Sequence, residues 1–195
     1  MLKKKEVVYR YILTEALERK QLSFTQLSLS RMFGISLSTV SNALKPLEKI
    51  GAIEKRTRSF NIIDIRKALS FWATARNMAK DIVYSARSDL PVQKIEAGMP
   101  AEVVFTAYSG YRFLYNEAPA DYGEIYVYAD KKALEGIKER FPETKGPPNV
   151  FVLEKDAFMP EGNIAPIPQI YVDLWNLKEW YARDYLVALE RRLFK

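Results

Sequence analysis

Apolar positions in the first third of the chain recur with the period of a helix and then change to the shorter period of strands. Val40, Leu44 and Leu47 stand at i, i+4 and i+7, so one stripe of a helix over residues 37–50 is predicted to be buried. A shorter helix is predicted over residues 24–33, capped by Ser23. Earlier still, a helix is predicted over residues 3–20.

Turn residues separate these predicted helices and fix their order. Gly34 supplies the left-handed backbone conformation that often ends a helix. Ser36 is a good N-cap, because its hydroxyl can accept a hydrogen bond from a free backbone N–H of the next helix. Gly51 closes that helix, and residues 52–63 read as two short strands around a basic turn. A helix, a turn, a second helix and a basic hairpin predict a winged helix-turn-helix.

The predicted winged helix leaves polar and basic side chains free on the helix face opposite the stripe and at the hairpin tip. Small hydroxyl, amide and basic side chains can enter a major groove and reach base edges or phosphates. The residues predicted to bind DNA are Ser36, Ser38, Thr39, Ser41, Asn42, Lys45, Lys49, Lys55, Arg56 and Arg58. A helix-turn-helix can also serve as a protein-interaction module, and the joint placement of these residues favours double-stranded DNA.

Two further features bear on the predicted DNA-binding surface. Pro46 lies inside the second helix and removes a hydrogen bond to the Asn42 carbonyl, so a bend is expected there. Lys3, Lys4 and Lys5 begin the first helix, where such a run can reach a phosphate backbone or remain a solvated tail.

A long helix is predicted directly after the hairpin. Residues 66–87 contain no Gly or Pro and carry a broad apolar face. This connecting helix would either dock on the winged domain or pair with its twin in a homodimer, and the sequence leaves both open. The break at residues 88–91 places a domain boundary within 86–92. The predicted organisation is a winged helix over 1–65, a connecting helix over 66–87 and a C-terminal domain over 92–195.

The remaining pattern alternates helices and strands, which predicts a small α/β domain and an α+β fold overall. The predicted elements are a buried helix over 101–115 interrupted near Ser109 and Gly110, a strand over 123–129, a helix over 131–141 capped by Asp130, a strand over 149–153, a short apolar segment over 168–174 and a final helix over 177–194.

Charge divides the chain in the same place as the predicted domains. The 195 residues carry a formal net charge of +6, and 48% of them are apolar. Residues 1–87 hold 17 Lys and Arg against 7 Asp and Glu, a net of +10, whereas residues 88–195 hold 13 against 17, a net of −4. A basic first half joined to an acidic second half is typical of a nucleic-acid-binding domain attached to a domain of another kind.

Absent residue types narrow the chemistry. The chain has no Cys and no His, which removes disulfides, thiolate nucleophiles and the commonest general base and metal ligand. No apolar run is long enough to cross a membrane, and the N-terminus does not read as a signal peptide. We therefore expect a cytoplasmic protein that needs no cofactor and is not an enzyme.

Three segments resemble a known family. They are the winged helix of residues 1–65, the segment 106–111 followed by the strand 124–128, and residues 168–174 leading into a last helix in which 183–189 closes the domain. On these segments the chain resembles the AbiEi-type antitoxins, which are transcriptional regulators of type IV toxin–antitoxin systems. The resemblance implies a DNA-binding repressor of its own operon, in some relatives beside a nucleotidyltransferase-like toxin partner.

The resemblance also implies that the C-terminal domain is similar in layout to a degenerate nucleotidyltransferase. Active enzymes of that kind carry Gly-Ser at a helix start and an Asp-x-Asp pair on the next strand. Here the order is Ser109-Gly110, and only Asp121 and Glu124 lie near the strand. Side chains three apart on a strand point to opposite faces, so no catalytic or metal site is predicted. The alternative is a winged helix fused to a nucleotide-binding or nucleotidyltransferase-like catalytic domain.

Two features of the second half are interpreted structurally. Asp173 stands in an apolar stretch before Trp175, where a helix cap is favoured over a buried functional acid. The tyrosines and tryptophans are interpreted as core rather than as a base-stacking platform.

Overall fold

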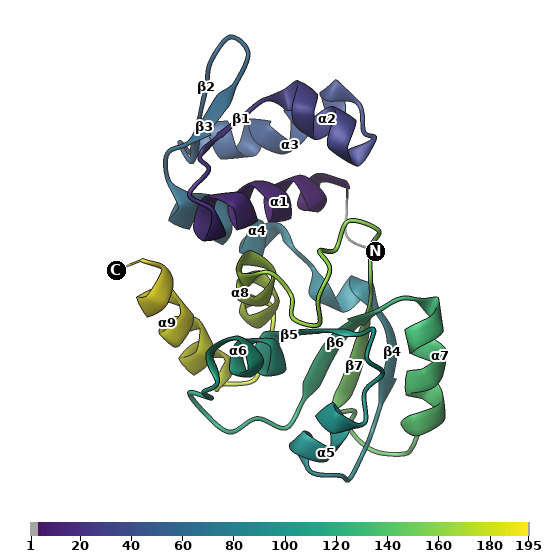
Figure 1. Cartoon of the computed structure of the whole chain (residues 1–195). Coiled ribbons are helices and arrows are strands. Elements are labelled where there is room, and N and C mark those ends of the chain that lie inside the picture. Colours follow the sequence, from purple (N-terminus) through teal and green to yellow (C-terminus); the bar gives the residue numbers. More distant parts are fainter. Residues whose placement is uncertain (1–3, 195) are drawn as a thin grey trace.

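The helix α1 (Lys4–Glu18) is the element against which both halves of the protein pack. The computed structural model describes residues 4–194. In it α1 packs against α3 on the winged-helix side and against α4 and α8 on the other side (Figure 1). Positions all round the helix are therefore buried, including Val8, Ile12, Leu13 and Ala16, which are 0% exposed. A helix that is covered on every side belongs to the interior of a fold rather than to its surface.

The N-terminal elements form the predicted winged helix-turn-helix. In chain order they are α1, β1 (Ser23–Phe24), α2 (Gln26–Phe33), α3 (Leu37–Lys49), β2 (Ile53–Lys55) and β3 (Phe60–Ile62). Strands β2 and β3 pair antiparallel, which confirms the predicted hairpin, and β1 adds a third strand beside β3. Because Ser23 lies in that strand, the predicted cap is wrong: Thr25 caps α2 by accepting from the Ser28 N–H.

The predicted long helix over residues 66–87 is wrong. Helix α4 (Ile65–Ala75) is capped by Asp64 and ends before Arg76, whose backbone is extended. A short 3-10 helix η1 (Met78–Asp81) follows, and then strand β4 (Ile82–Ala86) pairs antiparallel with β7. Burial of the Arg76 side chain and the pairing of β-branched and aromatic residues in β4 override the apolar periodicity. The second sheet thus takes a strand from the segment predicted as a connector.

The C-terminal half is a four-stranded mixed sheet covered by helices on both faces (Figure 1). Its strand order is β4-β7-β6-β5, in which only the β6–β7 pair is parallel among the described strands. The elements are β4, α5 (Val92–Ala97), β5 (Val104–Thr106), α6 (Ala107–Tyr115), β6 (Ile125–Ala129), α7 (Lys131–Arg140), β7 (Val150–Glu154), α8 (Ile167–Trp175) and α9 (Ala182–Leu193).

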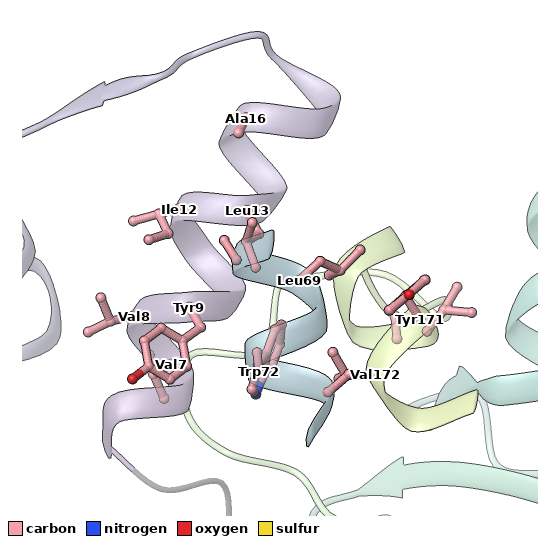
Figure 2. Packing of buried hydrophobic residues seen from close by; sticks show 14 of the residues in the cluster. Val7, Val8, Tyr9, Ile12, Leu13, Ala16, Leu69, Trp72, Tyr171 and Val172 are labelled. Atoms are coloured by element: carbon pink, nitrogen blue, oxygen red, sulfur yellow. The ribbon is translucent and has the colours of Figure 1, made fainter. Parts of the chain in front are cut away.

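Side chains alternate along β6 and divide the interior into two clusters. Tyr126 and Tyr128 face α6, α8 and α9, in a cluster that continues through α1 and α4 into the winged helix. Ile125 and Val127 face the other side, where α5 and α7 cover the sheet. In Figure 2, Trp72 on α4 lies between α1 and α8, so one continuous core joins the winged helix to one face of the sheet.

Other predicted boundaries in this half are confirmed or corrected. The strand 123–129 and the helix capped by Asp130 are confirmed as β6 and α7, and the strand 149–153 as β7. The helix over 101–115 is partly wrong, because its first part is strand β5 and α6 then runs unbroken through Gly110. A Cβ at Gly110 would lie 3.0 Å from the Phe105 carbonyl oxygen, so glycine allows this close packing.

The last helix begins later than the predicted residue 177. Helix α9 starts at Ala182, and two side chains just before it are held by distant residues. Glu179 accepts from the Tyr108 hydroxyl at 3.2 Å, and Tyr181 donates to Glu124. These contacts fix the segment as turns that join α8 to α9.

Candidate nucleic-acid interface

Helix α3 is placed by a cap at its start and an apolar stripe along one side. The Ser36 hydroxyl accepts from the Thr39 N–H at 3.1 Å, as predicted, and Gly34 ends α2 with φ of 58°. Val40, Leu44 and Leu47 are 0% exposed, packed against the rest of the winged helix from α1 to β3, which we call the head. The helix runs through Pro46 to Lys49. These contacts fix which face of α3 points outward.

The outward face of α3 is a continuous polar and basic stripe. Ser38, Asn42, Lys45 and Lys49 follow one another at i, i+4, i+7 and i+11, and all four are exposed. No ion pair within the described part of the chain engages either lysine. Thr39 and Ser41 are half-buried at the edges of this stripe. The stripe therefore offers an amide, a hydroxyl and two cations to a ligand.

Hydroxyl groups gather at the N-terminus of α3. Ser36 Oγ lies 2.8 Å from Ser38 Oγ and 2.9 Å from Thr39 Oγ1, so the three hydroxyls form one local network. The N-terminus of a helix carries free backbone N–H groups and a partial positive charge. Such an end suits a phosphate oxygen, with hydroxyls adding donors.

The three basic residues of the hairpin differ in whether they form ion pairs with nearby carboxylates. Lys55 Nζ lies 2.5 Å from Glu48 Oε2, and Arg56 Nη2 lies 3.6 Å from Glu54 Oε2. Arg58 is exposed and has no ion pair in the part of the chain that the structure describes. In Figure 1 the hairpin of β2 and β3 projects beyond the body of the protein. Arg58 is thus the wing residue most available to a phosphate.

The predicted lysine run at the N-terminus is only partly described. Lys3 lies outside the described residues. Lys4 and Lys5 are exposed at the start of α1. Nothing in their surroundings distinguishes a phosphate contact from a solvated tail, so their role stays a prediction.

A helix-turn-helix with a polar, basic outward stripe and a basic wing defines a winged-helix DNA-binding module. Residues 8–69 match the family model of the Crp-like helix-turn-helix domain. That match runs from α1 into α4 and supports a DNA-binding regulator. No curated protein and no solved structure matches the chain. None of the helices in residues 4–194 is long and apolar enough to cross a membrane.

Sequence reasoning missed a buried polar cluster that joins the winged helix to the C-terminal sheet. Its centre is Arg76, whose side chain is 0% exposed. Arg76 Nη1 donates to Glu6 Oε2 on α1 at 2.8 Å and lies 3.1 Å from Asp81 Oδ2. Arg76 Nε donates to Asp173 Oδ1 on α8 at 2.8 Å. One guanidinium therefore ties three separate segments together.

Neutral donors complete the cluster around Asp173. Its Oδ2 accepts from Thr106 Oγ1 and from the Tyr128 hydroxyl, both at 2.7 Å. Burial alone would lower the pKa of Arg76, but the oxygens of Tyr128 and Asp173 raise it above its ordinary value. The interpretation of Asp173 as a helix cap is wrong, because the carboxylate is fully buried inside α8. Glu6 and Asp173 stand 70 and 97 positions from Arg76, so the cluster as a whole forms only in the folded chain.

The carboxylate that lies directly before β6 is held by a tyrosine. Glu124 accepts from the Tyr181 hydroxyl, and its neighbour Tyr126 is core. No cluster of three or more Asp and Glu that could hold a metal ion occurs in residues 4–194. Most tyrosines of this half are buried, as interpreted, with Tyr108, Tyr111 and Tyr185 at 0% exposure. The interpretation of the tryptophans of this half as core is wrong, because Trp175 is 44% exposed and Trp180 is 79% exposed. Burial raises the pKa of Tyr122 to about 12, which suits hydrogen-bonding rather than acid–base chemistry at neutral pH.

Proposed function

We propose that the protein is a sequence-specific transcription regulator that reads duplex DNA through α3. The observation that carries the proposal is the exposed stripe of Ser38, Asn42, Lys45 and Lys49 on a Crp-like helix-turn-helix domain. Asn can pair bidentately with adenine, and Lys can donate to guanine or to phosphate. Arg58 and the N-terminus of α3 would contribute phosphate contacts that position the helix.

We further propose that the regulator represses its own operon, as the resemblance to AbiEi-type antitoxins implies. The C-terminal half then serves as a partner-binding or dimerising domain, and a nucleotidyltransferase-like toxin is the partner that the resemblance suggests. A cytoplasmic location follows from this role. The acidic balance of residues 88–195 supports a non-DNA role for that half.

The regulator proposal is tested on the promoter of the protein's own gene. We expect a mobility shift that survives a large excess of random-sequence DNA and a footprint of defined length. A promoter-driven reporter should fall when the protein is supplied. Binding that random DNA competes away as well as promoter DNA does would overturn the proposal of sequence-specific reading.

We also propose that the C-terminal half is not a magnesium-dependent nucleotidyltransferase. Support comes from the sequence of β6, which carries no Asp-x-Asp pair, and from Glu124, which lies directly before β6 and accepts from the Tyr181 hydroxyl. Purified protein incubated with magnesium and labelled nucleotides should transfer no label to RNA or protein. Transfer that Glu124→Gln abolishes would contradict this proposal and favour the catalytic alternative.

A further inference from the structure

A cleft of about 450 Å³ lies between the winged helix and the C-terminal half. Its apolar walls come from Val7 and Tyr11 on α1, Phe33 at the end of α2, Leu114 on α6, and Phe158 and Ile164 in the loop after β7. Figure 1 shows this loop rising from the sheet to α1 before it returns to α8. The volume falls in the range of about 300–1,000 Å³ that is typical of small-molecule sites.

Two bridges hold the loop against the head and keep the cleft formed. Arg10 on α1 donates to both oxygens of Asp156, at 2.8 and 2.7 Å, and the Arg10 side chain is 2% exposed. Beside it, the rings of Phe33 and Phe158 meet edge to face with centroids 5.1 Å apart. A bidentate ion pair and an aromatic contact fix both walls, so the cleft is preformed.

The charges around the cleft do not cancel. Both arginines that line it are already paired, Arg10 with Asp156 and Arg19 with Glu15 at 2.7 Å. The carboxylates of Glu18 and Glu161 also line it. Glu18 Oε1 accepts from the Ile167 backbone N–H at 3.4 Å, and neither carboxylate has an ion pair among residues 4–194. The excess charge offered to a ligand is therefore negative.

Besides the unpaired carboxylates, the cleft contains a buried hydroxyl that has no hydrogen-bond partner. Thr14 lines the same cleft, and its Oγ1 is shielded from bulk solvent and has no hydrogen-bond partner among the described residues. A buried polar atom without a partner is uncommon in folded proteins and costs stability. A bound donor or acceptor in the cleft would satisfy this hydroxyl.

We propose that this cleft binds a small organic cation, a molecule with an apolar or aromatic body and an ammonium group. The body would lie between Tyr11, Phe33 and Phe158, and the ammonium would meet Glu18 and Glu161 at the rim. Aromatic rings also favour a nearby cation through their negative faces. An organic anion of the same shape would face repulsion from both carboxylates.

Occupation of the cleft should also alter DNA binding, a consequence that rests on the proposed regulator function. The walls belong to the winged helix and to the C-terminal half, so a ligand that contacts both can favour one relative arrangement of the two over another. A ligand shifts an equilibrium only by its differential affinity for the two arrangements. Binding of the cation is measured first without DNA, because binding to the cleft and its effect on DNA affinity are separate questions.

The test compares three probes that share one body and differ in charge. They are 2-phenylethylamine, 2-phenylethanol and phenylacetate, each titrated at neutral pH into the full chain and followed by NMR shifts of backbone amides. We expect the amine to bind about five- to tenfold more tightly than the alcohol, and phenylacetate to bind most weakly. The shifted amides should be those of α1 and of the loop after β7.

Variants locate the charge preference. In Glu18→Gln plus Glu161→Gln, both exposed side chains keep their shape, and the preference for the amine over the alcohol should disappear. Glu135→Gln plus Glu139→Gln on α7 removes the same charge far from the cleft and should leave the preference unchanged. Thr14→Val, which keeps the volume and removes the hydroxyl, should weaken the amine about two- to tenfold.

Three outcomes would overturn the proposal: no binding of any probe, equal binding of amine and phenylacetate, or an unchanged amine preference in the Glu18 and Glu161 double variant. A mobility shift repeated with and without 2-phenylethylamine then tests the coupling alone. If the probe binds and the protein binds no DNA, the proposal of a cation site in the cleft is supported and the regulator proposal is contradicted.

Discussion

The outward face of α3 and the buried cluster around Arg76 use similar polar side chains in opposite ways. On α3, Asn42, Lys45 and Lys49 are exposed, and within residues 4–194 no side-chain hydrogen bond or ion pair engages them. In the cluster, Arg76 and Asp173 are 0% exposed at their side chains and bonded on several sides. Polar groups left without protein partners at a surface are available to a ligand, whereas polar groups satisfied inside the protein hold its parts in place.

This difference separates the expected effects of mutation. Variants in the Arg76 cluster should change the stability of the fold and leave the choice of DNA sequence alone. Variants on the outward face of α3 should change DNA recognition and leave stability alone, because exposed polar side chains contribute little to the folded core. Each prediction below measures the quantity that the variant is expected to change, and the Asn42→Ala prediction measures both.

Arg76→Ala should have the largest effect. Its removal leaves Glu6, Asp81 and Asp173 buried without the guanidinium that they share. Breaking a buried ion pair from one side costs about 3–5 kcal/mol, and the loss should appear in the free energy of unfolding in urea. Arg191→Ala, at an exposed position of α9, is the matched control and should change that free energy by less than about 0.5 kcal/mol. A loss below about 1 kcal/mol at Arg76 would mean that the cluster behaves like a surface pair.

Asp156→Asn should have a smaller effect that depends on pH. Burial raises the pKa of Asp156, but hydrogen bonds and charge from Arg10 outweigh it and hold the pKa below its ordinary value. The pair therefore stabilises the fold above the unfolded pKa of about 3.9, and this contribution is lost as the pH falls through the lower folded pKa. We expect a loss of about 1.5–3 kcal/mol at pH 7.

Urea unfolding at pH 7, 5 and 3 checks this prediction. The difference between wild type and Asp156→Asn should be full at pH 7 and 5 and should shrink toward the acid end. Asp89→Asn removes an exposed carboxylate that pairs with Arg87 and should cost less than about 1 kcal/mol. A difference that grows with acidification would reverse the assigned sign.

The head was predictable from sequence because its signals are local. Gly34, Ser36 and the spacing of Val40, Leu44 and Leu47 act within a few residues of one another, and the structure bears out each of them. The outward stripe of α3 follows directly from the buried one, because a helix fixes the opposite face.

The Arg76 cluster was not predictable because its members meet only in the folded chain. Glu6 and Arg76 stand 70 positions apart, and Arg76 and Asp173 stand 97 apart. Periodicity carried the predicted helix straight through Arg76, since an arginine between apolar residues looks like one position on a polar face. Asp173 in its apolar stretch was the one local sign, and a cap was the simpler interpretation.

Asn42→Ala tests the outward face of α3 directly. The change should cost about 1–3 kcal/mol on the preferred DNA site and much less on random DNA, while the melting temperature should hardly move. The rival is that Asn42 solvates its own carbonyl, which Pro46 leaves without a hydrogen bond. That rival predicts lower stability and an unchanged ratio of specific to random affinity. Gln93→Ala, an exposed amide on α5, is the control and should change neither quantity.

The wing should show the smallest effect, and the structure divides it between two arginines. Affinity for duplex DNA falls with salt at a slope of about 0.9 per phosphate neutralised, so each lost contact should flatten the slope by about that amount. Arg58→Ala should do so, because Arg58 has no ion pair within the described chain. Arg56→Ala should do so less, because its guanidinium lies 3.6 Å from Glu54 and that carboxylate offsets part of its charge. The double variant should have lower affinity for preferred and random sequences alike, since phosphate contacts carry no sequence information.

Fluorescence anisotropy at several salt concentrations measures these slopes. Wild-type affinity and slope in the double variant would show that the wing does not touch phosphate, and a loss confined to the preferred sequence would assign the wing to base reading instead.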